Sequence, residues 1–211
     1  MIDRPAQPAP SSHPAAHSDP AASKLGMWLF LFSEAVLFGT LFIAFATYLY
    51  HYRWMFRAAA HHLSRPVGAI NTALLLTSSL SIALAIAALQ RGRKRQSAGL
   101  LLLTVALAAG FLVIKGFEWT EKFRLGLYPL SETMRALPVG EQLFFGHYYI
   151  MTGLHGLHVA AGIGVILWAW RKVQRESIRP DRMRALENVG LYWHLVDIVW
   201  IYLFPLFYLI A

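Results

Sequence analysis

The chain has 211 residues, of which 57% are hydrophobic and 14% are charged. Soluble domains carry about 25% charged residues, so this composition argues against a soluble globule and against disorder over most of the chain. Cysteine is absent, which excludes disulfides, thiolate metal sites and cysteine nucleophiles. The net charge of +8 would suggest nucleic-acid binding in a soluble protein, whereas in a membrane protein it reflects Lys and Arg held in cytoplasmic loops.

Residues 1–22 are rich in Pro, Ala, Ser and His, show no apolar periodicity, and are predicted to form a disordered tail. Five apolar stretches follow, approximately from Leu25 to Tyr50, Gly68 to Leu89, Ala98 to Trp119, Leu143 to Trp170 and Val189 to Ile210. Crossing a bilayer takes about 20 apolar residues, and backbone groups in lipid must be hydrogen-bonded within the segment. The predicted fold is therefore all-α, an integral membrane bundle of five transmembrane helices over residues 23–211 after a disordered N-terminal tail.

The basic residues between the stretches predict the orientation of the helices. Ten lie in the second and fourth connections (Arg91, Arg93, Lys94, Arg95, Arg171, Lys172, Arg175, Arg179, Arg182 and Arg184) and six in the first and third (Arg53, Arg57, Arg65, Lys122, Arg124 and Arg135). Cytoplasmic loops carry an excess of Lys and Arg, so the N-terminus is predicted to be cytoplasmic and the C-terminus periplasmic. The basic runs contain almost no aromatic residues on which bases could stack, so no nucleic acid is expected as a partner.

Ionisable side chains lie inside three of the predicted membrane helices. Glu34 and Asp197 each lie about nine residues from the cytoplasmic end of their helix, roughly 14 Å deep, and His158 lies roughly 18 Å deep in the fourth helix. Such residues are costly in lipid, so each needs a reason. Two interpretations remain open: a buried hydrogen-bond network that holds the bundle together, and a proton-handling or partner-binding site.

The fourth apolar stretch contains two patterns. His155 and His158 are three residues apart, so we expect them to share one face of the helix. Gly146, Gly153 and Ala160 repeat every seven residues and form a stripe of small residues that permits close helix approach. A helix with both patterns is predicted to be central in the bundle, and its small-residue stripe is a candidate subunit interface.

The fifth stretch contains His194 and Asp197, again three residues apart. A carboxylate beside the imidazole would fix its tautomer or keep it protonated, and a purely structural pair is the alternative. A bis-histidine heme needs two His at matched depth, but His194 and His155 differ by roughly 13 Å. A stand-alone b-type cytochrome is therefore a weaker alternative, as is a metal site built from His155, His158 and Glu34.

The third stretch ends in Lys115, Glu118 and Lys122, whose spacings allow ion pairs along the helix. We expect a solvated helix end, with Glu118 as a further candidate for contact with a partner subunit. The sequence contains no Gly-x-Ser-x-Gly, phosphate-loop or His-Glu-x-x-His motif, and no catalytic residue is predicted. Five helices without an internal repeat favour a subunit of a larger complex over a transporter that would use Glu34 and Asp197.

Five segments resemble the motifs of one protein family, subunit III of the heme-copper oxidases. They are Gly26–Glu34, Ile70–Thr72, Glu118–Trp119, Thr152–Val159 and Tyr192–Trp200. In this order they are similar to the family's GMxLFxxSE, LNT, (Q/K)xxEY/W, TGxHGLHV and YWHxVDxVW motifs. The resemblance extends from Leu25 to Ala211, nearly everything except the tail.

The resemblance implies a subunit without a redox centre of its own. Subunit III packs on the catalytic subunit I, supports its proton uptake and durability, and binds phospholipid, whereas the hemes and copper that reduce dioxygen lie in partner subunits. By the same resemblance, the family's buried glutamate is Glu34, and its other motif residues are His155, His158, His194 and Asp197.

The expected setting follows from this resemblance. It implies a multi-pass protein of the bacterial plasma (inner) membrane, with oxidase subunits I and II, a small subunit IV and membrane lipids as partners. A cytochrome c oxidase is the first expectation, and association with a quinol oxidase or a nitric oxide reductase is the alternative. The family's long form has seven helices, and this chain resembles the last five. In the long form the first two helices form one wall of a lipid cleft, so a lipid site is expected only where a partner supplies that wall.

Overall fold

The computed structural model describes residues 20–210, and these residues form seven helices and no strand. The helices are α1 Pro20–His51, α2 Arg53–Ala60, α3 Arg65–Gln90, α4 Lys94–Arg124, α5 Glu132–Ala136, α6 Val139–Gln174 and α7 Arg184–Tyr208. Most of the predicted tail, residues 1–22, lies outside the described residues. Residues 20–22, which the sequence analysis assigned to the tail, are the first residues of α1.

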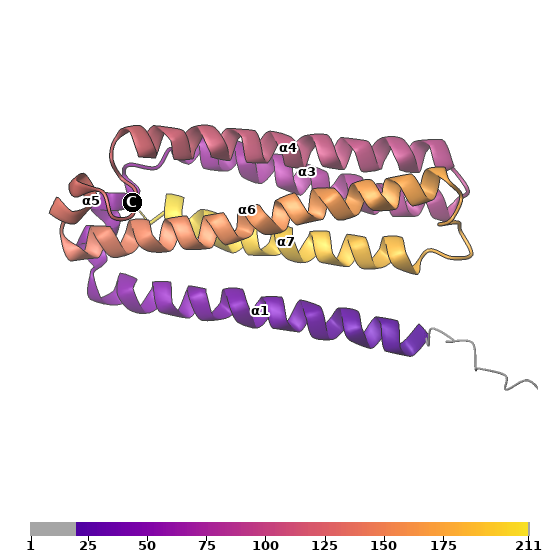
Figure 1. Ribbon diagram of the computed structural model, residues 1–211, viewed down its shortest axis with the longest axis horizontal. Helices are drawn as coiled ribbons and strands as arrows, with labels where there is room; N and C mark the ends of the chain where they lie inside the picture. Colours follow the sequence, from indigo (N-terminus) through magenta and orange to yellow (C-terminus); the bar gives the residue numbers. More distant parts are fainter. Residues whose placement is uncertain (1–19, 211) are drawn as a thin grey trace, which may run out of the picture.

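The five long helices confirm the predicted all-α membrane bundle. Within the described residues, α1, α3, α4, α6 and α7 are each long and apolar enough to cross a membrane. With 36 residues, α6 is roughly 54 Å long, more than the hydrocarbon core of about 30 Å requires. The sequence analysis did not predict the short helices α2 and α5, which lie at one end of the bundle (Figure 1).

Four of the long helices enclose the core, and α1 lies beside them (Figure 1). α3 and α6 each pack against both α4 and α7, so these four helices form a closed ring. α1 contacts α2, α6 and α7, and only 17% of its apolar span is buried, against 50% for α7. α6 contacts α1, α2, α4 and α7, which confirms that the fourth predicted span is central.

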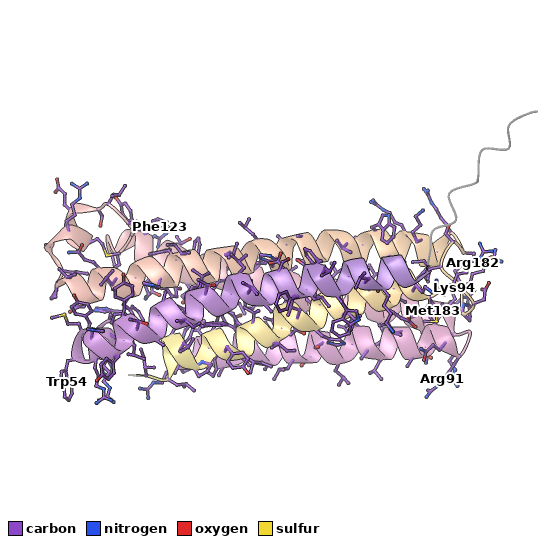
Figure 2. The ribbon with its side chains drawn as sticks, turned by 90° about the horizontal axis from the view of Figure 1, so that it is seen from below. Trp54, Arg91, Lys94, Phe123, Arg182 and Met183 are labelled. Carbon is purple, nitrogen blue, oxygen red and sulfur yellow. The ribbon has the colours of Figure 1, made fainter. Side chains whose placement is uncertain are left out.

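The two ends of the bundle carry different side chains. The α3–α4 and α6–α7 connections meet at one end, here called the basic end, where Figure 2 shows Arg91, Lys94 and Arg182. Trp54 lies at the opposite end in the same view, together with α2, α5 and the end of α7. We call this the α2/α5 end. The loops predicted to carry the excess of positive charge therefore share one end of the molecule.

Positive backbone φ angles end three of the long helices. Gly92 after α3 and Gly126 after α4 both have φ of +71°, a conformation that glycine adopts without steric cost. The amide of residue 93 then donates to the carbonyl of Ala88, and that of Leu127 to the carbonyl of Lys122, which satisfies carbonyls left free at the helix ends. After α6 the same role falls to Glu176, with φ of +57°.

Lys94 links the two connections at the basic end. Its ammonium donates to the carbonyl of Gln174 at 2.8 Å and to the carboxylate of Glu176 at 3.1 Å. The hydrogen bond and the charge of Lys94 hold the pKa of Glu176 below its ordinary value, and Arg179 adds to this effect. Since the Glu176 side chain is 60% exposed, this contact orients the loops and contributes little stability.

Two tryptophans of α7 donate hydrogen bonds to hydroxyl groups of α3 inside the bundle. The Nε1 of Trp193 donates to the Ser78 hydroxyl and that of Trp200 to the Thr72 hydroxyl, both at 3.0 Å. A buried indole N–H needs such a partner because water cannot reach it. The serine and threonine hydroxyls of α3 therefore act as hydrogen-bond acceptors between helices.

Small residues bring α6 and α7 together, but they are not those of the predicted stripe. A Cβ on Gly162 would lie 2.6 Å from the indole of Trp193, so glycine alone fits there. Within the stripe, Gly153 packs on a tryptophan of α4, whereas no described atom lies within 4 Å of a Cβ built at Gly146, and Ala160 is exposed. Gly146 and Ala160 thus stay available to lipid or to another subunit.

Candidate functional site

Glu34 of α1 and His158 of α6 meet at the edge of the bundle. The carboxylate Oε2 lies 2.9 Å from the imidazole Nε2, and the two side chains are 15% and 19% exposed. Phe38, one turn after Glu34, packs edge-on against the imidazole with 5.4 Å between ring centroids. Two residues predicted to lie at a similar depth in the membrane are therefore in direct contact, and they join α1 to α6.

The hydrogen bonds of His158 fix how many protons the pair holds. Nδ1 lies 2.7 Å from the carbonyl oxygen of Leu154, which can only accept, so Nδ1 carries a hydrogen. The contact between Nε2 and Glu34 then needs one further hydrogen, either on the imidazole or on the carboxyl group. In both arrangements the pair has no net charge. Transfer of this hydrogen from one side chain to the other therefore leaves the pair neutral.

A cavity of about 650 Å³ opens between α1, α6 and α7 on the side of this pair that faces the basic end. Its lining includes Met27, Phe30, Val165, Trp168, Arg184 and Tyr192. The Tyr192 hydroxyl donates to the main-chain oxygen of His158 at 3.0 Å, which connects the cavity wall to the pair. Mostly apolar walls with one guanidinium group suit an amphiphile with an acidic headgroup.

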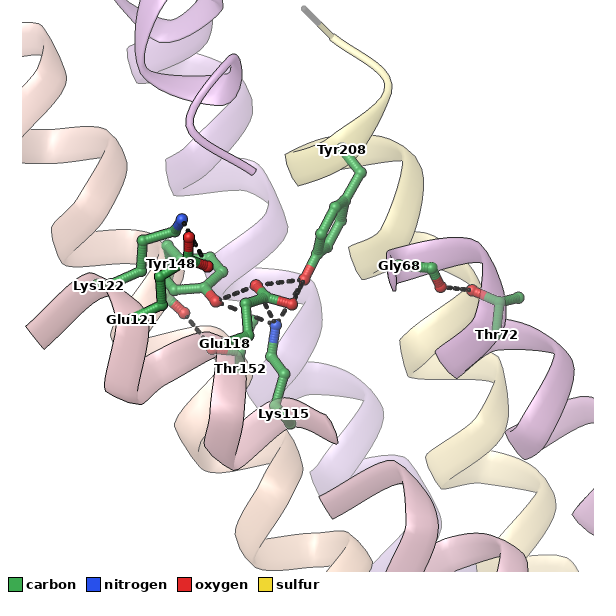
Figure 3. A network of polar contacts seen from close by, with 9 residues as sticks. All are labelled: Gly68, Thr72, Lys115, Glu118, Glu121, Lys122, Tyr148, Thr152 and Tyr208. Atoms are coloured by element: carbon green, nitrogen blue, oxygen red, sulfur yellow. Dashed lines mark hydrogen bonds and ion pairs between the residues drawn. The ribbon is translucent and has the colours of Figure 1, made fainter. Parts of the chain in front are cut away.

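A second polar cluster lies in the core toward the α2/α5 end (Figure 3). Lys115 and Glu118 of α4 form an ion pair at 3.1 Å, and they are only 5% and 6% exposed. The expectation of a solvated helix end is therefore wrong: Tyr148 of α6 and Tyr208 of α7 cover these two residues, and Lys122 is buried as well. Glu118 was also a candidate for subunit contact, yet its carboxylate is occupied by partners within the chain.

The hydrogen bonds of this cluster are saturated. The Lys115 ammonium has three hydrogens, and it contacts Glu118 at 3.1 Å, the Tyr148 hydroxyl at 3.1 Å and the Tyr208 hydroxyl at 2.6 Å. Both tyrosine hydroxyls in turn donate to the Glu118 carboxylate. The Trp200 ring adds a cation–π contact at 5.3 Å. A neutral cluster with every donor engaged indicates a structural lock between α4, α6 and α7.

His155 lies apart from the Glu34–His158 pair, in the core of the bundle. Its ring stacks on Trp200 with 5.2 Å between centroids and meets Phe111 edge-on at 5.6 Å. It thus faces α4 and α7, whereas His158 faces α1. The expectation that the two histidines share one face is wrong, because a separation of three residues turns the side chain by about 60° around the helix axis.

His194 and Asp197 do not form the predicted pair. His194 Nδ1 lies 2.6 Å from the Ser79 hydroxyl, a contact that joins α7 to α3. Asp197 is 3% exposed, and no ion pair in the described part of the chain includes it. Within residues 20–210 no group of three or more His, Asp or Glu side chains is arranged to hold a metal ion. His155, His158 and His194 lie at separate helix interfaces, against α7, α1 and α3.

Sequence reasoning missed the tyrosines at both polar clusters. Tyr148 and Tyr208 complete the buried lock, and Tyr192 connects the cavity to His158. Their positions in apolar helices could have indicated these contacts, since a buried tyrosine hydroxyl needs a hydrogen-bond partner. The identity of that partner could not be read from the sequence, because it lies on another helix.

Several known proteins are similar in sequence to this chain over nearly its full length. A family model described as cytochrome c oxidase subunit III matches residues 15–211. The chain is 35% identical over 203 residues to cytochrome c oxidase subunit 3 of Thermostichus vulcanus, which covers 93% of this chain and 91% of the relative. It is 28% identical over 199 residues to cytochrome bo(3) ubiquinol oxidase subunit 3 of Pseudomonas aeruginosa, covering 94% and 90%. It is 32% identical over 192 residues to heme-copper oxidase subunit I+III of Aeropyrum pernix, covering 87% of this chain and 22% of that protein.

Proposed function

Since the chain belongs to the cytochrome c oxidase subunit III family, we propose that it is the non-redox subunit III of a bacterial terminal oxidase. In this role it stabilises subunit I and supports proton uptake there. Dioxygen reduction and the coupled proton pumping take place in subunit I, where the hemes and copper reside. The Glu34–His158 contact beside the α1/α6/α7 cavity is the observation that carries the proposal.

Association with subunit I is supported by a relative and by the surface of the chain. The Aeropyrum pernix relative is named as a fused subunit I+III, so in that protein the two units are one polypeptide. In this chain α1 keeps most of its apolar span uncovered, and Gly146 and Ala160 of α6 leave space for a neighbouring helix. Subunit II and a small subunit IV complete the proposed complex.

A role in proton uptake is supported by the proton count of the Glu34–His158 pair. The pair holds one proton between an acid and a base and is largely shielded from solvent. The pair is neutral while it holds this proton and carries one negative charge after it gives the proton to an uptake route, so proton exchange alternates the pair between these two charges. We propose that the pair buffers proton entry at the subunit I interface and performs no chemistry on dioxygen.

Phospholipid is the ligand proposed for the α1/α6/α7 cavity. Arg184 would pair with a phosphate, and the apolar side chains of α1 and α6 would cover one acyl chain. Here α1 already supplies one wall, so the site does not depend wholly on helices that the long form of the family contains. A bound lipid would also fill the gap between α1 and the bundle.

Orientation and electron donor complete the proposal. We place the basic end, where α1 begins, on the cytoplasmic side of a bacterial inner membrane and the α2/α5 end on the periplasmic side, because positive loops favour the cytoplasmic side.

Cytochrome c is the proposed electron donor. Ubiquinol is the second candidate, since one relative is named a ubiquinol oxidase subunit. Oxygen consumption by the purified complex with each reduced donor separates the two.

The direct test uses Glu34→Gln, which keeps the shape of the side chain and removes its acid–base function. We expect the variant complex to assemble and to start at nearly the parent rate. It should then complete several-fold fewer turnovers before it inactivates, because proton supply to subunit I falters. Glu132→Gln is the matched control, since Glu132 is exposed and forms no ion pair in the described part of the chain. If the Glu34→Gln complex completes as many turnovers as the parent before it inactivates, Glu34 has a packing role only.

A further inference from the structure

We propose that a second cavity, at the α2/α5 end, binds the phosphate headgroup of an anionic phospholipid. Its volume is about 1010 Å³, and it lies between the end of α1, the helix α2 and the residues that follow α7. The lining includes Ala46, Leu49, Arg53, Arg57, His61 and Leu209. The inference goes beyond the function proposed above, because it concerns the opposite end of the bundle and needs neither Glu34 nor the α1/α6/α7 cavity.

One face of α2 and its C-terminal flank presents the positive charge to this cavity. Arg53, Arg57 and His61 are each four residues apart, so they lie above one another on one side of the helix, and all three are exposed. The adjoining side of the helix buries Phe56, Ala59 and Ala60 in the core, which fixes how the helix is turned. In the described part of the chain neither arginine forms an ion pair, and no Asp or Glu lines the cavity. Two guanidinium groups on successive turns match the oxygens of a phosphate.

The apolar surroundings favour a lipid over an acidic protein segment. Ile43, Ala46 and Tyr50 follow one another at spacings of three and four on α1, and this exposed stripe leads from the membrane span into the cavity. The span ends at residue 51, so the arginines of α2 lie at the membrane surface. Trp54 is 77% exposed, and the Arg57 guanidinium lies 5.5 Å from its ring, an arrangement typical of the headgroup region. An acyl chain would follow the α1 stripe while the phosphate meets the arginines.

The experiment measures lipid binding to the full-length chain by native mass spectrometry after delipidation in detergent. Dioleoyl-phosphatidylglycerol and dioleoyl-phosphatidylcholine are titrated separately, and inorganic phosphate is added as a competitor. The test variant is Arg53→Gln/Arg57→Gln. The matched control is Arg124→Gln/Arg135→Gln, which removes two exposed positive charges from α4 and α5 at the same end but outside the cavity.

We expect the parent and the control to bind phosphatidylglycerol more tightly than phosphatidylcholine. The test variant should bind phosphatidylglycerol roughly tenfold more weakly, because two charge-assisted hydrogen bonds are lost. Arg53→Lys/Arg57→Lys should fall between parent and test variant, since lysine keeps the charge and loses the fork geometry. Lipid bound in the α1/α6/α7 cavity is common to all these proteins and cancels in the comparison.

Three results would overturn the inference. The first is equal phosphatidylglycerol affinity in the test variant and the control. The second is displacement of the lipid by millimolar inorganic phosphate, which would assign the site to the free anion. The third is unchanged lipid affinity together with loss of a partner subunit from the oxidase purified through this chain, which would assign the α2 face to a protein.

Discussion

At the scale of single residues, enclosed charges decide how the helices fit together. Lys115 and Glu118 are among the least exposed charged side chains, and two hydroxyls from other helices complete their hydrogen bonds. A buried charge is tolerated only while its partner is present, since an unpaired ion in a low-dielectric interior is strongly unfavourable. The lock therefore specifies how α4, α6 and α7 meet.

Removal of one charge from this lock should lower the free energy of unfolding far more than removal of both charges. We expect Glu118→Gln to lower the free energy of unfolding by about 3–5 kcal/mol, because the Lys115 ammonium is left without a counter-ion. Lys115→Met/Glu118→Gln should recover most of that loss. Unfolding of the purified chain by titration with a denaturing detergent gives these differences, and Glu132→Gln is the control, because Glu132 is exposed and forms no ion pair in the described part of the chain. Equal stability of the single and double variants would contradict the lock.

The sequence predicted some of these residues well and others poorly, for a physical reason. Glu34 and His158 were predicted as site residues at a similar depth in the membrane, and the two are in contact. Spacing along the helix also predicted the Lys115–Glu118 pair, but it could not show burial, which depends on tyrosines from distant parts of the chain. His155 contacts other helices than His158 does, because three residues turn the side chain by about 60° around the helix axis.

At the scale of elements, α1 is attached at several points along its length and is otherwise free. Phe45 of α1 packs on Phe56 of α2 at 5.3 Å between centroids and on Phe207 of α7 at 4.9 Å. The Glu34–His158 contact holds α1 to α6 further along. Hydrophobic length predicted the five spans, whereas α2 and α5 were missed because elements of 8 and 5 residues give little periodic signal.

Loss of the contacts among Phe45, Phe56 and Phe207 should detach α1 and α2 together from the rest of the bundle. Phe56 is fully buried, so we expect Phe56→Ala to lower the free energy of unfolding by about 3–5 kcal/mol. Hydrogen exchange should rise in residues 45–60 and stay low in α4 and α6. Phe117→Ala makes the same chemical change at a position that is 72% exposed, and its effect should stay within about 0.5 kcal/mol. Similar effects of the two substitutions would contradict the proposed attachment.

At the scale of the whole molecule, the chain is a membrane scaffold whose long helices enclose a largely apolar core. The core residues of α3, α4, α6 and α7 enclose one neutral lock, and the edge of the bundle carries one acid–base pair. Membership of the subunit III family places such a scaffold in a heme-copper oxidase. The central claim is that the scaffold serves a catalytic partner and does no redox chemistry itself.

The most direct measurement is an optical spectrum of the complex purified through a tag on this chain, followed by the spectrum of the chain after its separation from the partners. We expect a heme Soret band in the complex. We also expect all heme and copper to stay with the partner subunits when this chain is removed. Heme or copper retained by the isolated chain, or recovery of the tagged chain from its own membrane with no heme-bearing partner, would contradict the account.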